Sequence, residues 1–196
     1  MRNDVTVAVL AGGLSRRMGT NKSFVLLDGK PLIAHVIDCV TALRLPVLLV
    51  TNTPEQYAHL DLPMYSDVYP MCGSLGGLYT ALHYSLTDYT LCVACDMPFV
   101  CVDLLRYMLG LRSGVDSVVP YIAGNYESLH AIYHRTCLPV IREQLEQGQF
   151  RISSIYARLQ VRLVTAAEVE RFDPDQRSFV NLNTPDDVAH IQKLLP

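Results

Sequence analysis

Charged residues are scarce in this sequence: Asp, Glu, Lys and Arg make up 18% of its 196 residues, whereas 50% are hydrophobic. Disordered chains have the opposite balance, because they cannot bury enough apolar surface to offset the entropy of ordering, so the composition excludes a disordered chain. Internal repeats, low-complexity tracts and linkers are also absent. We therefore expect a single domain, spanning residues 1–196, with a full hydrophobic core.

The sequence also lacks an excess of positive charge. Its 16 lysines and arginines are outnumbered by 19 acidic residues, which gives a net charge of −3. Proteins that bind nucleic acids or acidic membranes through their overall electric field are basic. Neither nucleic acid nor a membrane is therefore an expected partner.

Long hydrophobic runs are missing as well. The longest apolar region, residues 31–50, is interrupted by His35, Asp38 and Arg44, so it does not predict a membrane-spanning helix. Residues 1–4 lead directly into a short apolar run and show none of the features of a secretory signal peptide. We expect a cytoplasmic protein.

The six cysteines do not form a complete metal-binding pattern. Cys92 and Cys95 have the spacing of a zinc or redox pair, but no second cysteine pair or nearby histidine completes a metal site. They lie in the apolar run of residues 91–95, where a strand would point the two thiols to opposite faces. We interpret the cysteines as reduced core residues; a redox function built on Cys92 and Cys95 is the alternative.

Strands and helices are predicted to alternate along the chain. Apolar runs predict strands at residues 5–11, 25–27, 47–50, 64–66, 89–95, 116–120, 129–133 and 161–164. Apolar stripes with helical spacing predict helices at residues 31–43, 75–82, 102–112, 138–147 and 152–159, and a last helix opens at residues 184–187. This alternation predicts an α/β protein with a mostly parallel sheet between two helical layers, a three-layer α/β/α, Rossmann-like arrangement.

One predicted helix contains an unusual pair of glycines. Ser74 is expected to cap this helix, and Gly76 and Gly77 fall in its first turn. Glycine costs a helix about 1 kcal/mol relative to alanine, so the pair requires a reason. The sequence leaves two reasons open: close approach of a ligand, and tight packing of the helix on the sheet.

Residues 5–22 combine a buried strand with a glycine-rich, basic loop. Gly12 and Gly13 follow the strand directly and allow backbone N–H groups to approach an anionic ligand closely. Three basic residues follow in the same loop: Arg16, Arg17 and Lys22. The spacing matches neither the P-loop motif nor the G-x-G-x-x-G motif of dinucleotide-binding folds. On its own, the segment is either a phosphate-binding loop or a solvated basic loop.

Two aspartates follow other predicted strands. In an open α/β sheet, ligands bind outside the C-terminal ends of the strands, so Asp67 and Asp96 are expected to share one crevice with Gly12 and Gly13. Asp96 suits Mg²⁺, which prefers one or two carboxylates together with phosphates and water. The alternatives are that Asp96 caps its own loop through Pro98 and that Asp67 belongs to a turn.

Four sequence segments together resemble a known family. Leu10-Ala-Gly-Gly-Leu-Ser-Arg-Arg-Met-Gly-Thr-Asn-Lys22 resembles the L-A-G-G-x-S-x-R-M-G-x-x-K signature of nucleotidyltransferases with a glycosyltransferase-A-like fold. The other three are Gly73-Ser-Leu-Gly-Gly77, Cys95-Asp-Met-Pro98 and Asn181-Leu-Asn-Thr-Pro-Asp186. They are similar to the G-P-L-x-G, C-D-x-P and N-x-N-T-P-E motifs of the molybdenum cofactor guanylyltransferases. The resemblance runs from the first strand to the last helix.

This resemblance implies a reaction. The protein would transfer GMP from GTP to the terminal phosphate of the molybdenum cofactor (Mo-molybdopterin), form the guanine dinucleotide cofactor and release pyrophosphate. The resemblance further implies Mg²⁺ as the cofactor, and GTP and molybdopterin or the molybdenum cofactor as substrates. Transient contacts with other cofactor-biosynthesis proteins or with molybdoenzymes are implied as well.

The resemblance also implies roles for individual residues. Nucleotide contacts are implied for Leu10, Ala11, Gly12, Gly13, Lys22, Asn52, Asp67 and Asp96. The implied catalytic residues are Arg17, Lys22 and Asp96, and Asp96 would hold the Mg²⁺ ion. Asn181 and Asn183 would position the phosphate or the pterin substrate, together with Arg17. Asn52 is assigned by its place after the second long strand, where Thr51 is the other candidate.

Two residues depart from the family pattern. Asn21 stands where many members have aspartate, and Ser74 replaces the usual proline. Neither change removes a charge that the chemistry requires, although Ser74 is expected to alter the loop that shapes the base pocket. The histidines, among them His130 and His134, are interpreted as structural.

Other functions remain possible at this stage. The nearest is cytidylyl or other nucleotidyl transfer to a pterin or another phosphorylated acceptor, but Asn181-Leu-Asn183 favours the guanylyl branch, because the cytidylyl branch is expected to be rich in aspartate here. A non-catalytic nucleotide-binding module is disfavoured by the presence of both Lys22 and Asp96.

Overall fold

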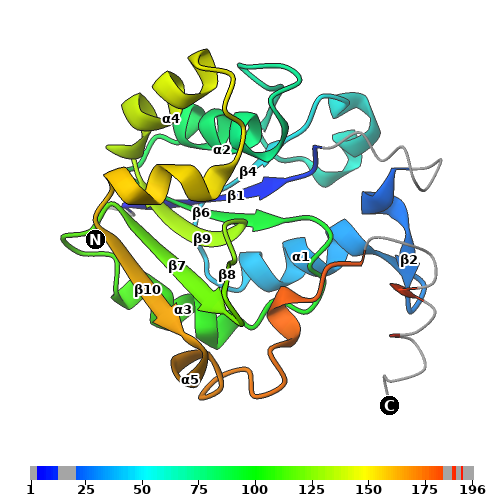
Figure 1. Ribbon diagram of the computed structural model, residues 1–196. Helices are drawn as coiled ribbons and strands as arrows, with labels where there is room; N and C mark the ends of the chain where they lie inside the picture. Colours follow the sequence, from blue (N-terminus) through cyan, green and yellow to red (C-terminus); the bar gives the residue numbers. More distant parts are fainter. Residues whose placement is uncertain (1–3, 13–20, 183–186, 189–190, 192–196) are drawn as a thin grey trace.

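The computed structural model describes residues 4–12, 21–182, 187–188 and 191. Its centre is an eight-stranded sheet (Figure 1) made of β1 (Val5–Leu10), β4 (Val47–Val50), β5 (Met64–Tyr65), β6 (Tyr89–Ala94), β7 (Ser117–Ile122), β8 (Asn125–Tyr126), β9 (His130–His134) and β10 (Val161–Thr165). The order is β10-β7-β9-β6-β1-β4-β5, and β8 pairs with β7. A separate hairpin joins β2 (Leu26–Leu27) to β3 (Lys30–Pro31).

The sheet is mostly parallel, as the alternation of elements predicts. Strands β5, β4, β1 and β6 run parallel, and Val7 at the centre pairs with Val47 on one side and Leu91 on the other. β9 lies antiparallel between β6 and β7, and β10 is parallel to β7. The C-terminal ends of β1, β4, β5 and β6 therefore lie along one edge of the sheet.

Helices cover both faces of this sheet and confirm the three-layer arrangement (Figure 1). One face packs on α1 (Leu32–Thr41) and α3 (Val102–Gly110), and the other packs on α2 (Gly73–Tyr84) and α4 (Cys137–Glu146). The alternation along β1 explains this division, because Val7 and Val9 belong to the first core cluster and Ala8 to the second.

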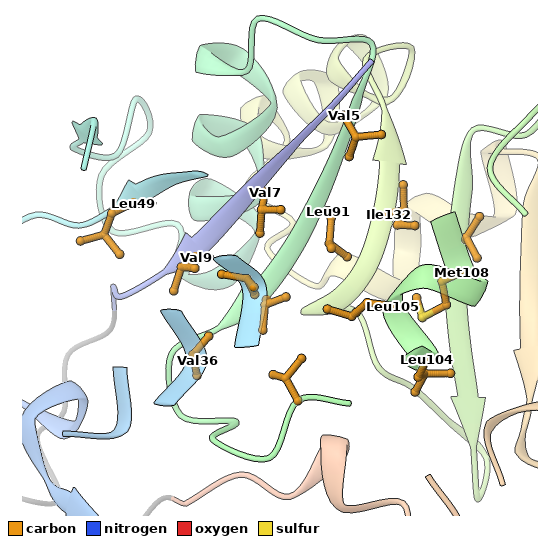
Figure 2. Close-up of a cluster of buried hydrophobic side chains, with 14 of the residues drawn as sticks. Val5, Val7, Val9, Val36, Leu49, Leu91, Leu104, Leu105, Met108 and Ile132 are labelled. Carbon is orange, nitrogen blue, oxygen red and sulfur yellow. The ribbon is translucent and has the colours of Figure 1, made fainter. Parts of the chain in front are cut away.

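The first core cluster contains the β-branched side chains of the central strands. Figure 2 shows the valines of β1 on the same face of the sheet as Leu91 and Ile132, with Val36 of α1 and Leu105 of α3 in the same cluster. All of these side chains are buried. Each such side chain contributes about 1.5–3 kcal/mol when it is fully removed from water.

The structure corrects several details of the predicted elements. Ser74 does not cap α2, because the helix begins at Gly73 and Cys72, which precedes it, makes no side-chain capping bond. Residues 152–159 form a 3-10 helix, η3 (Ile152–Arg158), rather than an α-helix. Short elements that the sequence did not predict are β3, where Pro31 was expected to begin a helix, β8, η1 (Lys22–Phe24), η2 (Pro54–Leu60), α5 (Ala166–Val169) and η4 (Arg177–Phe179). The helix start at residues 184–186 lies outside the described residues.

The two glycines of α2 are explained by packing. A Cβ atom at Gly76 would lie 2.8 Å from the carbonyl oxygen of Tyr69, and one at Gly77 would lie 3.0 Å from Cδ2 of Leu10. Both distances are shorter than normal contacts. A larger residue at Gly76 would push α2 away from the preceding loop, and one at Gly77 would force the Leu10 side chain to shift. Of the two open reasons for these glycines, the structure favours tight packing.

The cysteines are placed as structural residues. Cys92 belongs to the cluster under α2 and α4, whereas Cys95 packs against the cluster on the other face, as predicted for a strand. Burial raises the pKa of the Cys92 thiol, and it raises the pKa of Cys95 to about 12, so both stay protonated at neutral pH. The described residues contain no group of three or more His, Cys, Asp or Glu side chains placed to bind a metal ion together. These observations argue against the redox alternative.

The helices of the described residues also bear on the membrane prediction. None of them has both the length and the apolar character needed to cross a bilayer.

Candidate functional site

The glycine-rich loop begins where three strand ends are joined by backbone hydrogen bonds. The N–H of Cys95 donates to the carbonyl oxygen of Leu10 at 3.1 Å, and the N–H of Ala11 donates to that of Val50 at 2.9 Å. The segments that follow β1, β4 and β6 are therefore held side by side. They lead to Gly12, Asn52 and Asp96 respectively, which brings these predicted site residues to the same edge of the sheet.

Gly12 is exposed, and its surroundings differ from those of the glycines in α2. Apart from its chain neighbours, no residue in the described part of the structure has an atom within 4 Å of a Cβ placed on Gly12. Packing against these residues therefore does not require glycine here. A ligand that lies against the backbone does require it, because a side chain would hold the ligand away from the N–H groups.

Asn21 fixes the turn that carries Lys22. Its side-chain oxygen accepts a hydrogen bond from the N–H of Ser23 at 3.2 Å and so caps η1. Its Nδ2 atom donates to Gln56 Oε1 and to Tyr57 Oη, both at 2.9 Å. An ionised aspartate could not donate these two bonds, so the asparagine that departs from the family pattern has a structural use here.

Tyr57 is a positioning residue that the sequence did not reveal. Its side chain is fully buried, and its hydroxyl donates to Ser23 Oγ at 2.9 Å. Ser23 Oγ in turn donates to the sulfur of Cys95 at 3.2 Å. This chain of contacts ties η1, and with it Lys22, to the end of β6. Tyr57 is 34 residues from Ser23 in sequence, and neither residue stands in a recognisable motif.

Lys22 and Asp96 influence each other electrostatically. Asp96 is half-buried, and this burial raises the pKa of its carboxyl group, whereas the positive charge of Lys22 lowers it. The structure thus brings together the cation and the carboxylate that the sequence singled out. A positive and a negative group near the same edge of the sheet can bind complementary parts of a ligand: anionic phosphate oxygens on Lys22 and a cation on Asp96.

Asp67 lies at the same edge of the sheet, beside Asn52. The two residues exchange a pair of hydrogen bonds across the ends of β4 and β5. Asn52 is exposed there, whereas Thr51 is buried and its hydroxyl accepts a bond from the N–H of Thr53. Of the two residues considered after β4, Asn52 is therefore the one that a ligand can reach.

A groove of about 540 Å³ adjoins Asp96. Asp96, Asn181 and Ser74 line it, so Ser74 faces this groove. The N–H of Leu182 donates to the carbonyl oxygen of Asp96 at 3.0 Å, which holds Asn181 beside the carboxylate. The rest of the lining comes from Ala94, Met97 and residues 124–129 and 150–153.

Part of the groove was missed by sequence reasoning. The polar segment around Tyr126 and Glu127 lies between two predicted strands and was left without a role, as was Arg151. The available signal was a polar connection between two buried strands, which is a common place for binding residues. Three predicted site residues, Gly13, Arg17 and Asn183, lie outside the described residues.

The chain matches a known protein family over most of its length. A family model described as "MobA-like NTP transferase domain" matches residues 7–163. The chain belongs to this family. The matched region includes the described parts of the glycine-rich loop, Asn52, Asp67 and Asp96. Asn181 and Asn183 lie beyond it.

Related proteins can be aligned over nearly the whole length of the chain. The "probable molybdenum cofactor guanylyltransferase" of Natranaerobius thermophilus is 34% identical over 201 residues, which cover 100% of this chain and 98% of the relative. The "molybdenum cofactor guanylyltransferase" of Desulfosudis oleivorans is 36% identical and covers 94% of this chain and 92% of its own length.

A solved structure agrees with the fold. The crystal structure of "molybdopterin-guanine dinucleotide biosynthesis protein A" from Archaeoglobus fulgidus superposes with a TM-score of 0.83 at 30% sequence identity. The match covers 96% of this chain and 97% of that one. The family resemblance and the α/β fold predicted from the sequence are thereby confirmed, and the chain is a nucleotidyltransferase of molybdenum cofactor biosynthesis.

Proposed function

We propose that this nucleotidyltransferase transfers GMP from GTP to the terminal phosphate of Mo-molybdopterin, forms the guanine dinucleotide cofactor and releases pyrophosphate. The observation that carries the proposal is that exposed Gly12, Lys22 and Asp96 gather at one edge of the sheet, with a groove of about 540 Å³ beside Asp96. The groove offers room for a ligand directly beside Asp96. The choice of guanine and of the pterin is supported by the names of the relatives.

The proposed step is a displacement at phosphorus. An oxygen of the acceptor phosphate forms a bond to the α-phosphorus of GTP, and the bond from that phosphorus to the bridging oxygen breaks. The bonding electron pair leaves with pyrophosphate. A phosphate oxygen is already ionised at neutral pH, so the protein needs no general base. Its tasks are to align two anions and to neutralise their charge.

Lys22 and Arg17 are suited to the second task. The hydrogen bonds of Asn21 hold the turn from which the Lys22 side chain extends, at the start of η1, so the backbone of Lys22 is in place before the ligand binds. Arg17 supplies a second cation in the same loop by its sequence position. On the nucleotide side we place Leu10, Ala11, Gly12, Gly13, Asn52 and Asp67, and on the acceptor side Asn181 and Asn183.

Asp96 is the residue that we propose as the ligand of Mg²⁺. The donor set fits this ion, because Mg²⁺ takes one or two carboxylates from a protein and completes its shell with phosphates and water. Burial raises the pKa of the Asp96 carboxyl, and a bound cation would compensate for that lost solvation. When bound, the ion would neutralise negative charge on the leaving pyrophosphate.

The proposal is tested by measuring pyrophosphate release from GTP with and without molybdopterin. We expect release only when both substrates and Mg²⁺ are present, because the acceptor phosphate is the nucleophile. Equal release in the absence of the pterin would show hydrolysis of GTP and would contradict the proposal.

A further inference from the structure

Glu127 lines the groove beside Asp96, and none of the roles above uses it. Its backbone is fixed on both sides: the N–H of Glu127 donates to the carbonyl oxygen of Pro120 at 2.9 Å, and its carbonyl oxygen accepts from the N–H of His130 at 3.0 Å. The residue therefore sits on the framework of β7 and β9. The point from which its side chain extends is therefore held in a constant position, as a recognition group requires.

The electrostatic surroundings of Glu127 differ from those of Asp96. Burial raises the pKa of the Glu127 carboxyl, and within the described part of the chain no cation offsets this effect. At Asp96, by contrast, Lys22 lowers the pKa. Arg151 also lines the groove, but within the described residues it forms no ion pair with Glu127, so the Glu127 carboxylate is left without a cationic partner. A half-buried carboxylate without a cation is best satisfied by a ligand that brings N–H donors.

The walls around Glu127 suit a flat, ring-shaped ligand. The side chains of Tyr126 and Phe150 line the same groove and are 38% and 45% exposed. The ring of Tyr126 lies 4.7 Å from that of Tyr156, and these two tyrosines also line an adjoining cavity of about 350 Å³. Exposed aromatic rings next to a polar recognition group favour stacking with a heterocycle.

We infer that Glu127 recognises the aminopyrimidinone edge of the pterin acceptor. Its two carboxylate oxygens would accept parallel hydrogen bonds from the ring N3–H and from the exocyclic 2-amino group, while Tyr126 and Phe150 contact the ring faces. Charge-assisted pairs of this kind are strong and specific in geometry. The inference rests on the proposed function and deepens it, since it names the group that selects the acceptor.

This placement gives the acceptor a direction in the groove. The end that carries the phosphate points to Asp96 and Lys22, and the pyrimidinone end points to Glu127. Both carboxylates line one groove of about 540 Å³, which is within the usual range for sites that bind small molecules. The two acidic residues then have separate tasks: Asp96 binds Mg²⁺ for phosphoryl transfer, and Glu127 binds the pyrimidinone edge of the acceptor.

A binding experiment isolates this recognition from catalysis. The probes are pterin and lumazine, which differ at position 2, where lumazine has a carbonyl oxygen in place of the amino group; both are followed by their own fluorescence, without any nucleotide. We expect the wild-type protein to bind pterin about tenfold more tightly than lumazine, since lumazine lacks one donor for Glu127. In Glu127→Gln, pterin should weaken about tenfold, whereas lumazine should not weaken, because the carboxamide can donate to its carbonyl oxygen.

Glu146→Gln is the matched control, because Glu146 is an exposed glutamate on α4 outside the groove. It should bind both probes as the wild-type protein does. In the full reaction, Glu127→Gln should raise the KM for molybdopterin about tenfold and leave the KM for GTP unchanged. Circular dichroism of the variant should match that of the wild-type protein.

The outcomes separate the inference from the proposed function. A wild-type protein that binds pterin no better than lumazine, or a Glu127→Gln variant that keeps the wild-type preference and KM, would overturn the role of Glu127 even if guanine dinucleotide forms. Selective pterin binding that depends on Glu127, without any dinucleotide product from GTP, would support that role and refute the proposed reaction.

Discussion

Asn52 and Asp67 orient each other through two hydrogen bonds. The Nδ2 atom of Asn52 donates to Oδ2 of Asp67 at 2.7 Å, and its Oδ1 atom accepts from the backbone N–H of Asp67 at 2.8 Å. The pair joins the end of β4 to the loop after β5. Because one residue satisfies both the carboxylate and the backbone of the other, Asp67 has a fixed direction before any ligand binds.

Removing this pair should weaken nucleotide binding. We expect Asn52→Ala to raise the KM for GTP by about three- to tenfold, because Asp67 loses its orientation, with little change in the KM for molybdopterin. Steady-state kinetics with each substrate varied in turn measures both values. An unchanged KM for GTP would show that Asp67 does not need Asn52, and a parallel rise in both KM values would show a general loss of structure.

Asp96 should be required for turnover and not for folding. In Asp96→Asn, the side chain keeps its shape but loses its charge, and we expect the rate of Mg²⁺-dependent pyrophosphate release to fall by about 100-fold or more. Circular dichroism and the midpoint of urea unfolding should stay close to the wild-type values. A variant that retains the wild-type rate would refute Asp96 as the metal ligand.

Tyr57 links the stability of the protein to the position of Lys22. Tyr57→Phe removes the hydroxyl that bonds Ser23 and Asn21 inside the protein, so the free energy of unfolding should fall by about 1–2 kcal/mol. The KM for GTP should rise in the same variant, since η1 loses part of its support. The measurements are urea denaturation and steady-state kinetics.

Tyr84→Phe serves as the control for this substitution. Tyr84 is 36% exposed and stacks on Tyr65, with ring centroids 4.0 Å apart, away from η1. Neither stability nor the KM for GTP should change in this variant. If Tyr57→Phe behaves like Tyr84→Phe, the hydroxyl of Tyr57 has no positioning role.

His130 should make the folded protein sensitive to acid. It is fully buried, both ring nitrogens lack a hydrogen-bond partner within the described residues, and burial lowers its pKa to about 4 from the usual 6.5. Between these values the unfolded chain binds a proton that the folded protein does not bind. Stability should therefore fall as the pH is lowered through this window.

The test compares His130→Leu with the wild-type protein by urea unfolding. Between about pH 7.5 and about pH 5, the wild-type protein should lose roughly 2 kcal/mol more of its free energy of unfolding than the variant does. Equal losses in both proteins would mean that His130 is protonated in the folded state, which would contradict its burial as an unpaired neutral ring.

The sequence predicted the framework of the fold because the signals are local. The run from Val5 to Leu10 is apolar apart from Thr6, and all six residues are buried, which is typical of a strand covered on both faces, as β1 is. The stripe on α1 has the period of a helix. The short elements were not predicted: β8 has two residues and depends on its pairing with β7. Tertiary contacts decide such elements, and no local pattern records them.

The residues of the candidate site that follow directly after a strand could be predicted from the sequence. Gly12, Asp67 and Asp96 each follow a strand, and parallel strands place their C-terminal ends at one edge. The partners that orient these residues come from distant segments. Tyr57 reaches Asn21 across 36 residues, and Glu127 enters the groove only because β9 returns antiparallel beside β6. A sequence read along one dimension does not show these contacts.

The most direct test of the proposed GMP transfer is to identify the nucleotide that the protein transfers. The protein is incubated with molybdopterin, Mg²⁺ and equal concentrations of GTP, CTP, ATP and UTP, and the dinucleotide products are identified by mass spectrometry. We predict that the guanine dinucleotide is the main product. A reaction that yields mainly the cytosine dinucleotide, or no dinucleotide at all, would contradict it.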